Sequence, residues 1–172
     1  MRILIATPLY PPEVAPAAAY AKELARRLSA RHEVAVLAHA HLPEELPNVR
    51  LVAIDKRRPR LARLFAFTRA LRREARGAET AIAINGASVE LALLPGIAAP
   101  FIFSLADKAA QARGGLLARR ARAQARALLR EVPPPRPEIL PLEPYPAEEI
   151  AEYEASWSAH LDTIETILNH AR

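Results

Sequence analysis

The side chains best suited to bind a polar ligand in this chain follow three short apolar runs. Residues with hydroxyl, carboxylate and amide groups come after these runs in the sequence. These groups hydrogen-bond hydroxyl-rich ligands, and a lysine adds a partner for phosphate. Each apolar run has the character of a buried parallel strand, so the polar residues after it fall at the carboxyl edge of a sheet, where open α/β sheets bind ligands. The candidate binding residues of these segments are Thr7, Tyr10, Glu13, Asn85, Gly86, Ser88, Asp107 and Lys108.

The spacing of these residues does not assign a catalytic step. Glu13 is placed to act as a general base, and it is equally placed to balance the dipole of a following helix. Asn85 and Gly86 can orient a ligand or form an ordinary turn. Asp107 and Lys108 can meet a hydroxyl and a phosphate, or remain a solvated pair. We therefore predict a binding edge and leave its catalytic residues unassigned.

The sequence excludes the common nucleotide-binding motifs at this edge. Residues 7–17 contain no glycine, and the four prolines among them lack the N–H group that phosphate-binding loops use. His39 and His41 have no third ligand spaced to complete a metal site, so we interpret them as loop residues. The absence of cysteine excludes a thiolate zinc site and a disulfide framework. We expect neither a bound cofactor nor a metal ion.

The elements that must position these residues alternate between strands and helices. Apolar runs without polar alternation predict strands buried on both faces, and the segments between them have helical spacing. This order predicts an α/β fold with a doubly wound parallel, Rossmann-like sheet flanked by helices. The expected strands lie at residues 3–6, 34–37, 49–54, 80–84 and 101–105, and the expected helices at residues 17–30 and 61–75, with a short helix capped by Ser88.

Two segments rich in arginine are also predicted to be helical. The first covers residues 61–75, with arginines on its outer side and an apolar side toward the sheet. The second covers residues 111–131. The residues of the first helix that we expect to face inward are Leu61, Leu64, Phe65, Thr68 and Leu71.

The composition changes after residue 131. Residues 132–147 contain seven prolines, which predict an extended strap because proline breaks a helix. Residues 148–172 place Trp157 on a single apolar helical stripe, which must be buried. We expect an α/β domain over residues 1–131, then the strap, then a helix that packs back on that domain. A docking surface for a partner protein is the alternative for this helix.

Charge is unevenly distributed along the 172 residues. Residues 1–132 hold 22 Lys and Arg against 11 Asp and Glu, whereas residues 133–172 hold 2 against 8. A basic field attracts phosphates, nucleic acid or an anionic membrane, although arginines on ordinary solvated faces give the same count. The arginines have no interleaved aromatic platform, which argues against nucleic acid. Because no apolar run is long enough to span a membrane, we expect a cytoplasmic protein that can contact the inner face of the cell membrane.

The segment RILIATPLYPPEVAPAAAYAKELARRLSARHEVAVLA combines a strand, a P-x-Y-P-P-E loop, a helix and a second strand. This combination resembles the N-terminal part of glycosyltransferase family 4 enzymes, which have the GT-B fold. The resemblance is specific over residues 1–55 and extends by element order to about residue 108. The terminal helix with Trp157 also resembles the closing helix of that family. The matching positions in the first segment are Pro8, Tyr10, Pro11, Pro12, Glu13, Tyr20, Leu24, His32, Glu33 and Val34.

The resemblance implies the acceptor-binding, N-terminal domain of a hexosyl transfer enzyme, and it adds Ala15, Pro16 and Tyr20 to the expected binding residues. In the family a Gly-Gly pair, here Ala15 and Pro16, approaches the donor diphosphate, and an active-site histidine stands where this chain has Ala106. The family's second, donor-binding domain has no counterpart in these 172 residues. We therefore expect a domain that either binds a sugar or lipid-linked acceptor or completes an enzyme with a separate donor-binding chain, and we do not expect the chain to be active alone. The alternative is a non-catalytic interaction or scaffold protein that retains the fold.

Overall fold

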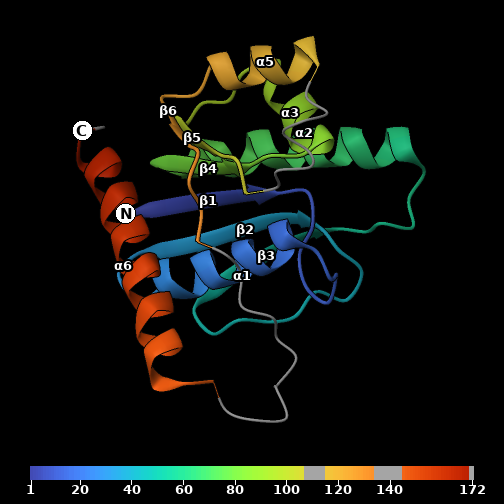
Figure 1. Cartoon of the computed structure of the whole chain (residues 1–172). Helices are drawn as coiled ribbons and strands as arrows, with labels where there is room; N and C mark the ends of the chain where they lie inside the picture. Colours follow the sequence, from blue (N-terminus) through green and yellow to red (C-terminus); the bar gives the residue numbers. More distant parts are fainter. Residues whose placement is uncertain (107–114, 134–144, 171–172) are drawn as a thin grey trace.

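A computed structural model of the chain describes residues 1–106, 115–133 and 145–170. They form a six-stranded sheet in the order β3-β2-β1-β4-β5-β6, and every neighbouring pair is parallel (Figure 1). The predicted doubly wound, Rossmann-like α/β fold is thus confirmed. The strands are β1 (Arg2–Thr7), β2 (Glu33–His39), β3 (Val49–Ile54), β4 (Thr80–Ile84), β5 (Phe101–Ser104) and β6 (Ala127–Leu129).

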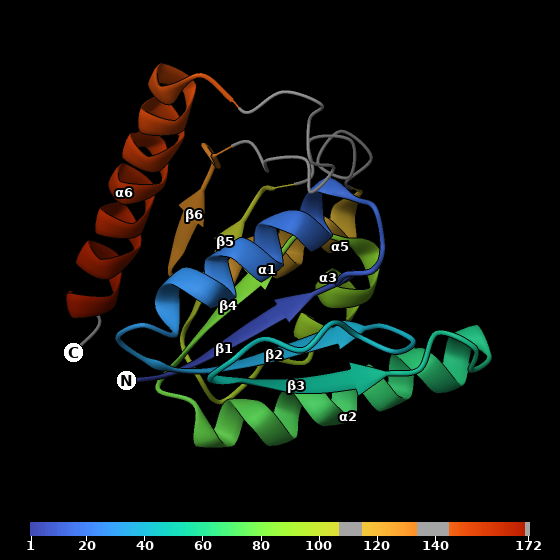
Figure 2. The ribbon, with the colours of Figure 1, turned by 90° about the horizontal axis from the view of Figure 1, so that it is seen from below.

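Helices cover both faces of the sheet, which is why its central strands are apolar throughout. In β1, Ile3 and Ile5 point toward the face of α1, whereas Leu4 and Ala6 point toward the face of α2. Figure 2 shows α1 lying across one face, with α2 on the other. The helices are α1 (Pro16–Leu28) and α6 (Ala147–Asn169) on the first face, and α2 (Arg60–Gly77), α3 (Ala87–Leu93) and α5 (Leu116–Ala123) on the second.

The C-terminal helix α6 packs back on the α/β domain, as predicted. Trp157 is fully buried, and its ring stacks on Tyr20 of α1 at a centroid distance of 5.6 Å. The Arg27 guanidinium lies 5.2 Å from the Trp157 ring centroid and donates two hydrogen bonds of 2.8 Å to Glu154. A further contact joins His32 Nε2 and Glu165 Oε1 at 2.8 Å. Residues 134–144, most of the predicted strap, lie outside the described residues.

The prediction of one helix over residues 111–131 is wrong over its described part. α5 ends at Ala123, and Ala127–Leu129 form β6, the edge strand beside β5. The backbone N–H of Arg126 donates to the Phe101 carbonyl at 2.9 Å as the chain enters this strand. A three-residue strand is defined by its pairing with β5, so helical spacing along the chain could not reveal it.

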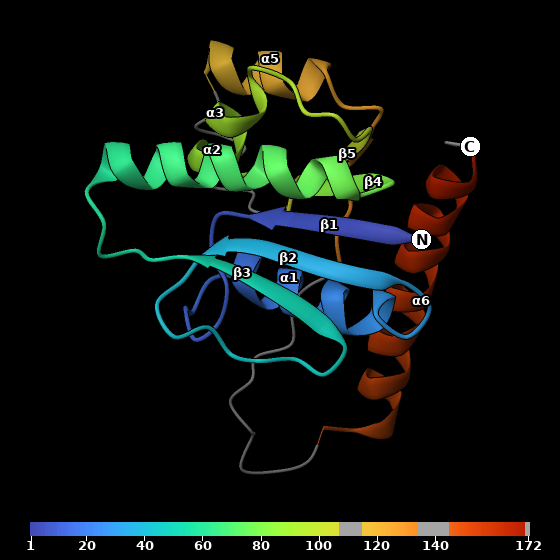
Figure 3. The same cartoon turned by 180° about the vertical axis from the view of Figure 1, so that it is seen from behind.

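Two further local predictions are wrong. Ser88 is not a helix N-cap, because α3 already begins at Ala87 and its N-cap is Gly86. Leu61 and Phe65 do not face inward, since their exposed fractions are 72% and 74%. The first turns of α2 extend past the carboxyl ends of the strands, where there is no sheet for them to cover (Figure 3). Phe67, Leu71 and other residues further along α2 are the ones buried against the sheet.

Within the described residues, no helix is both long enough and apolar enough to cross a membrane.

Candidate functional site at the carboxyl edge of the sheet

The segment between β1 and α1 leaves the sheet at its carboxyl edge, as the strand order requires. Thr7 is the last residue of β1 and is fully buried, and its hydroxyl donates to the Leu9 carbonyl at 2.8 Å. α1 begins at Pro16, where the missing N–H costs nothing because the first helical residue has no intrahelical acceptor. Ala15 provides no side-chain cap to this helix. Ala15 is half-buried and Pro16 is exposed, so both lie at the rim of the edge.

The turn between β4 and α3 packs directly against this segment. A Cβ atom on Gly86 would lie 2.7 Å from Cγ and 2.8 Å from Cβ of Pro8, so glycine permits the close approach. Asn85 is fully buried, and its backbone N–H donates to the Ser104 carbonyl of β5 at 2.9 Å. Ser88 follows, half-buried, in the first turn of α3. The structure therefore brings the first two predicted binding segments together.

Charged side chains form the outer rim of the edge on the side of β3. Glu13 Oε1 lies 2.6 Å from Lys56 Nζ, which links the β1–α1 segment to the segment before α2. The backbone N–H of Glu44 donates to the Pro11 carbonyl at 3.1 Å, and Lys22 donates to the Glu44 carboxylate at 2.7 Å. The Pro11–Pro12 peptide bond within this rim is cis. The Glu13 side chain remains 41% exposed, so its carboxylate is open to a ligand.

Two of the predicted binding residues belong to the core behind the edge. Tyr10 and Tyr20 are fully buried in the cluster between the sheet, α1 and α6. The Tyr20 hydroxyl lies 2.8 Å from His160 Nε2, and burial raises the pKa of this hydroxyl well above its ordinary value. Burial also lowers the pKa of His160 to about 4, so its neutral ring can accept the Tyr20 hydrogen bond. Tyr20 thus holds α1 against α6 and presents no group to solvent.

The structure adds a histidine that the sequence interpretation placed in a loop. His39 is the last residue of β2, only 5% exposed, with its ring centroid 4.6 Å from that of Phe67. Both ring nitrogens lack a hydrogen-bond partner among the described residues. Burial, together with nearby Arg63 and Lys56, lowers the pKa of His39 to about 4. The sequence does hold a signal for this burial: His39 lies two residues after the apolar Leu37, and alternate residues of a strand share a face.

The third predicted segment cannot be placed with the other two. Asp107 and Lys108 lie outside the described residues, and Ala106 before them packs partly buried against the α1 side of the core. In the ranges that the structure covers, no group of three or more acidic, histidine or cysteine side chains could hold a metal ion.

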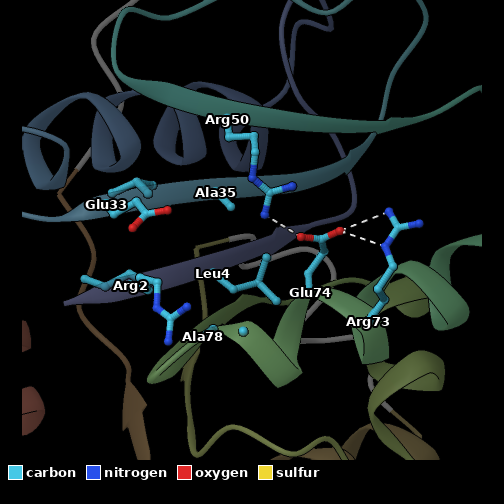
Figure 4. A pocket seen from close by; sticks show the side chains of 11 residues that line it. Arg2, Leu4, Glu33, Ala35, Arg50, Arg73, Glu74 and Ala78 are labelled. Atoms are coloured by element: carbon cyan, nitrogen blue, oxygen red, sulfur yellow. Dashed lines mark hydrogen bonds and ion pairs between the residues drawn. The ribbon is translucent and has the colours of Figure 1, made fainter.

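Two hollows lie away from the candidate binding residues. One, of about 160 Å³, lies at the amino ends of β1 and β2 beside the last turns of α2. There Arg50 and Arg73 both pair with Glu74, whose side chain is only 9% exposed (Figure 4). The other, of about 400 Å³, lies between β6 and α6 and includes His160. None of the predicted binding residues lines either hollow.

Comparisons of the chain with protein-family models and with curated proteins gave no match. The chemistry of the edge therefore has to be judged from its own groups. They are an exposed carboxylate paired with an ammonium group, and a buried neutral imidazole near two cations. Of these, the Glu13–Lys56 pair is exposed and its groups suit hydroxyl-rich or phosphate-bearing molecules, whereas the imidazole lies behind the edge.

Proposed function

We propose that this chain is a glycosyltransferase-4-like N-terminal domain that binds a sugar or lipid-linked acceptor at the carboxyl edge of its sheet. The observation that carries the proposal is the position of the P-L-Y-P-P-E loop. It follows β1 at the edge where parallel α/β sheets bind ligands, and its Pro8 packs against Gly86 of the neighbouring turn. The fold and the loop that resembles the family thus support the same place for the ligand.

In this proposal the rim residues contact the acceptor, and the buried residues hold the rim in place. The Glu13 carboxylate accepts a hydrogen bond from an acceptor hydroxyl. Lys56, 2.6 Å from Glu13, orients that carboxylate and faces any phosphate of a lipid-linked acceptor. Thr7 and Tyr20, both fully buried, fix the two ends of the β1–α1 segment.

The donor side is proposed to come from a separate chain that completes the hexosyl transfer enzyme. Ala15 and Pro16 stand where the family has its Gly-Gly pair, and each brings a cost to close contact with a diphosphate. Ala15 carries a Cβ atom, and Pro16 has no N–H to donate. The Cβ atom of Ala15 and the missing N–H of Pro16 both agree with a chain that binds the acceptor and leaves donor binding to a partner.

Isothermal titration calorimetry and a transfer assay test the proposal. The full chain is titrated with alkyl glycosides as acceptor probes and with a panel of nucleotide sugars as donor probes. We expect glycoside binding that Glu13→Gln weakens about tenfold, because a charge-assisted hydrogen bond is lost. Glu45→Gln, at an exposed position of the β2–β3 connection, is the matched control and should leave the affinity unchanged. Tight nucleotide-sugar binding with turnover by the chain alone would contradict the proposal.

A non-catalytic interaction or scaffold protein is the second candidate. It is favoured by one observation, the complete burial of Thr7, Tyr10, Tyr20 and Asn85, which leaves few of the predicted binding groups at the surface. If folded Glu13→Ala and Asn85→Ala variants retained every binding event of the parent chain, the edge would have no ligand role. The scaffold interpretation would then replace the first.

A further inference from the structure

Helix α2 has a tip that the domain does not use. The helix covers Arg60–Gly77, and Phe67, Leu71 and Ala75 bury it against the sheet. Its first two turns project beyond the carboxyl ends of the strands, as the views from the front and from behind agree (Figures 1 and 3). This tip is therefore free to contact something outside the domain.

The tip carries large apolar side chains in solvent. Leu61 and Phe65 are 72% and 74% exposed, and their spacing of four residues places them on the same side of the helix. Neighbouring segments of the same edge add Val14, which is fully exposed, and Leu42, which is 78% exposed. Single exposed apolar residues are common, but two large ones side by side on one projecting helical tip indicate a contact surface.

Arginines continue the side of α2 that Leu61 and Phe65 begin. Arg69, Arg72 and Arg76 follow at spacings of three and four residues, and the structure shows no ion pair for them within its described ranges. α2 contains six arginines and one acidic residue, Glu74. The Glu74 carboxylate is nearly buried and is neutralised by Arg50 and Arg73, so it does not offset this stripe.

The acidic groups near the tip are also largely neutralised. Glu13 pairs with Lys56, and Glu44 pairs with Lys22. Asp55 pairs with the Arg57 guanidinium, whose Nε lies 3.5 Å from Asp55 Oδ2. The surface formed by the exposed tip and the arginine stripe is therefore apolar at one end and basic along its length. We call it the α2 surface, defined by Leu61, Phe65, Arg69, Arg72 and Arg76.

We propose that the α2 surface docks on an anionic phospholipid bilayer. Leu61 and Phe65 enter the headgroup region, and the three arginines contact lipid phosphates. A projecting apolar tip with one phenylalanine favours a bilayer over single-stranded nucleic acid, which binds to several aromatic side chains on which successive bases stack. The surface projects instead of forming a groove, so it also offers no concave seat for a protein helix. This proposal is independent of sugar transfer, because it involves no group of the acceptor site.

Vesicle co-sedimentation with the full chain tests the proposal. The probes are vesicles of phosphatidylcholine alone and vesicles containing about one third phosphatidylglycerol. We expect binding to the anionic vesicles only, and weaker binding as the salt concentration rises. The triple variant Arg69→Gln, Arg72→Gln, Arg76→Gln should lower the partition coefficient roughly 100-fold, from about fivefold per arginine. The double variant Leu61→Ser, Phe65→Ser should lower it about tenfold by removing the inserted apolar area.

Matched variants elsewhere on the surface control for charge and apolarity. Arg31, Arg119 and Arg120 are exposed, so their triple replacement by Gln removes the same charge away from α2. Leu116→Ser with Ile150→Ser removes two exposed apolar side chains away from α2, which are 79% and 40% exposed. Both control variants should bind anionic vesicles nearly as well as the parent chain.

A fluorescence measurement separates insertion from simple charge attraction. Phe65→Trp adds an exposed indole, whereas the native Trp157 is fully buried. On anionic vesicles the emission of this variant should shift to shorter wavelength and be quenched by brominated acyl chains. Equal vesicle binding by the α2 and control triple variants, no binding to anionic vesicles, or no shift on binding would each overturn the proposal. Retention on DNA with no vesicle binding would assign the α2 surface to nucleic acid instead.

Discussion

Replacing His39 by leucine should stabilise the protein at neutral pH and reduce its sensitivity to acid. The imidazole is 5% exposed, and its two nitrogens have no hydrogen-bond partner among the described residues. Unpartnered buried polar groups cost free energy because they give up water without gaining a replacement. A leucine at the end of β2 keeps the contact with Phe67 and removes both unpartnered atoms, so we expect a gain of about 1 kcal/mol at pH 7.5.

The acid response follows from the direction of the pKa shift. Burial, with Arg63 and Lys56 nearby, lowers the pKa of His39 from 6.5 to about 4 in the folded chain. As the pH falls through 6.5, the unfolded chain takes up a proton that the folded chain does not, and stability is lost until about pH 4. At pH 5.0 this loss is roughly 2 kcal/mol for His39, and roughly the same for His160, whose pKa is also lowered to about 4.

Urea unfolding at pH 7.5 and pH 5.0 measures both effects. The parent chain should lose roughly 4 kcal/mol between the two conditions from its two buried histidines, and His39→Leu should lose roughly half as much. His41→Leu is the matched control, because His41 lies two residues further along with a 41% exposed side chain. If His39→Leu lost as much stability as the parent chain between pH 7.5 and 5.0, burial would not be holding this imidazole neutral, and the reasoning would be wrong.

Two core contacts give further predictions. Trp157→Ala should lower the free energy of unfolding by about 3–5 kcal/mol, because removing a fully buried ring that stacks on Tyr20 leaves a cavity. Urea unfolding measures this loss. A loss below about 1 kcal/mol would mean that α6 contributes little to the core. Gly86→Ala should cost about 1–3 kcal/mol, since the added Cβ would lie 2.7 Å from Cγ of Pro8. Adding Pro8→Ala should recover part of that loss, and two independent, additive losses would refute the contact as its cause.

The sheet could be predicted from the sequence because its central strands are buried on both faces. Such strands are uniform apolar runs, so their limits appear directly: the sequence predicts a strand over residues 80–84, and β4 occupies that range. The predicted strand over residues 49–54 is also confirmed as β3, although β3 is an edge strand that is only partly buried. The C-terminal helix was equally clear, because the apolar residues around Trp157 recur at helical spacing over about six turns. Both signals are patterns of apolar residues that repeat along one continuous segment, so they can be recognised from the sequence of that segment alone.

Features that depend on distant segments could not be predicted in this way. β6 is three residues long and exists because β5 offers it a free edge. Helical periodicity placed Leu61 and Phe65 on one side of α2, but it does not show how far a helix extends beyond its sheet. The close contact of Gly86 with Pro8 joins turns that are about eighty residues apart in the chain. At the candidate site, the order of the strands was predictable and the burial of Tyr10 and Tyr20 was not.

The position of α6 follows from the faces on which the strand connections place their helices. In a doubly wound sheet each crossover contributes a helix, but residues 40–48 join β2 to β3 without one, and two prolines lie among them. The connections after β3 instead place α2, α3 and α5 on the opposite face, so among the described residues no crossover helix covers β4, β5 and β6 on the face that carries α1. Trp157, Ile164 and Leu168 of α6 join Ile82, Ile102 and Leu129 of those strands in one hydrophobic cluster. α6 thus completes the second layer of the fold, and its tie to Tyr20 fixes the helix that begins at the candidate site.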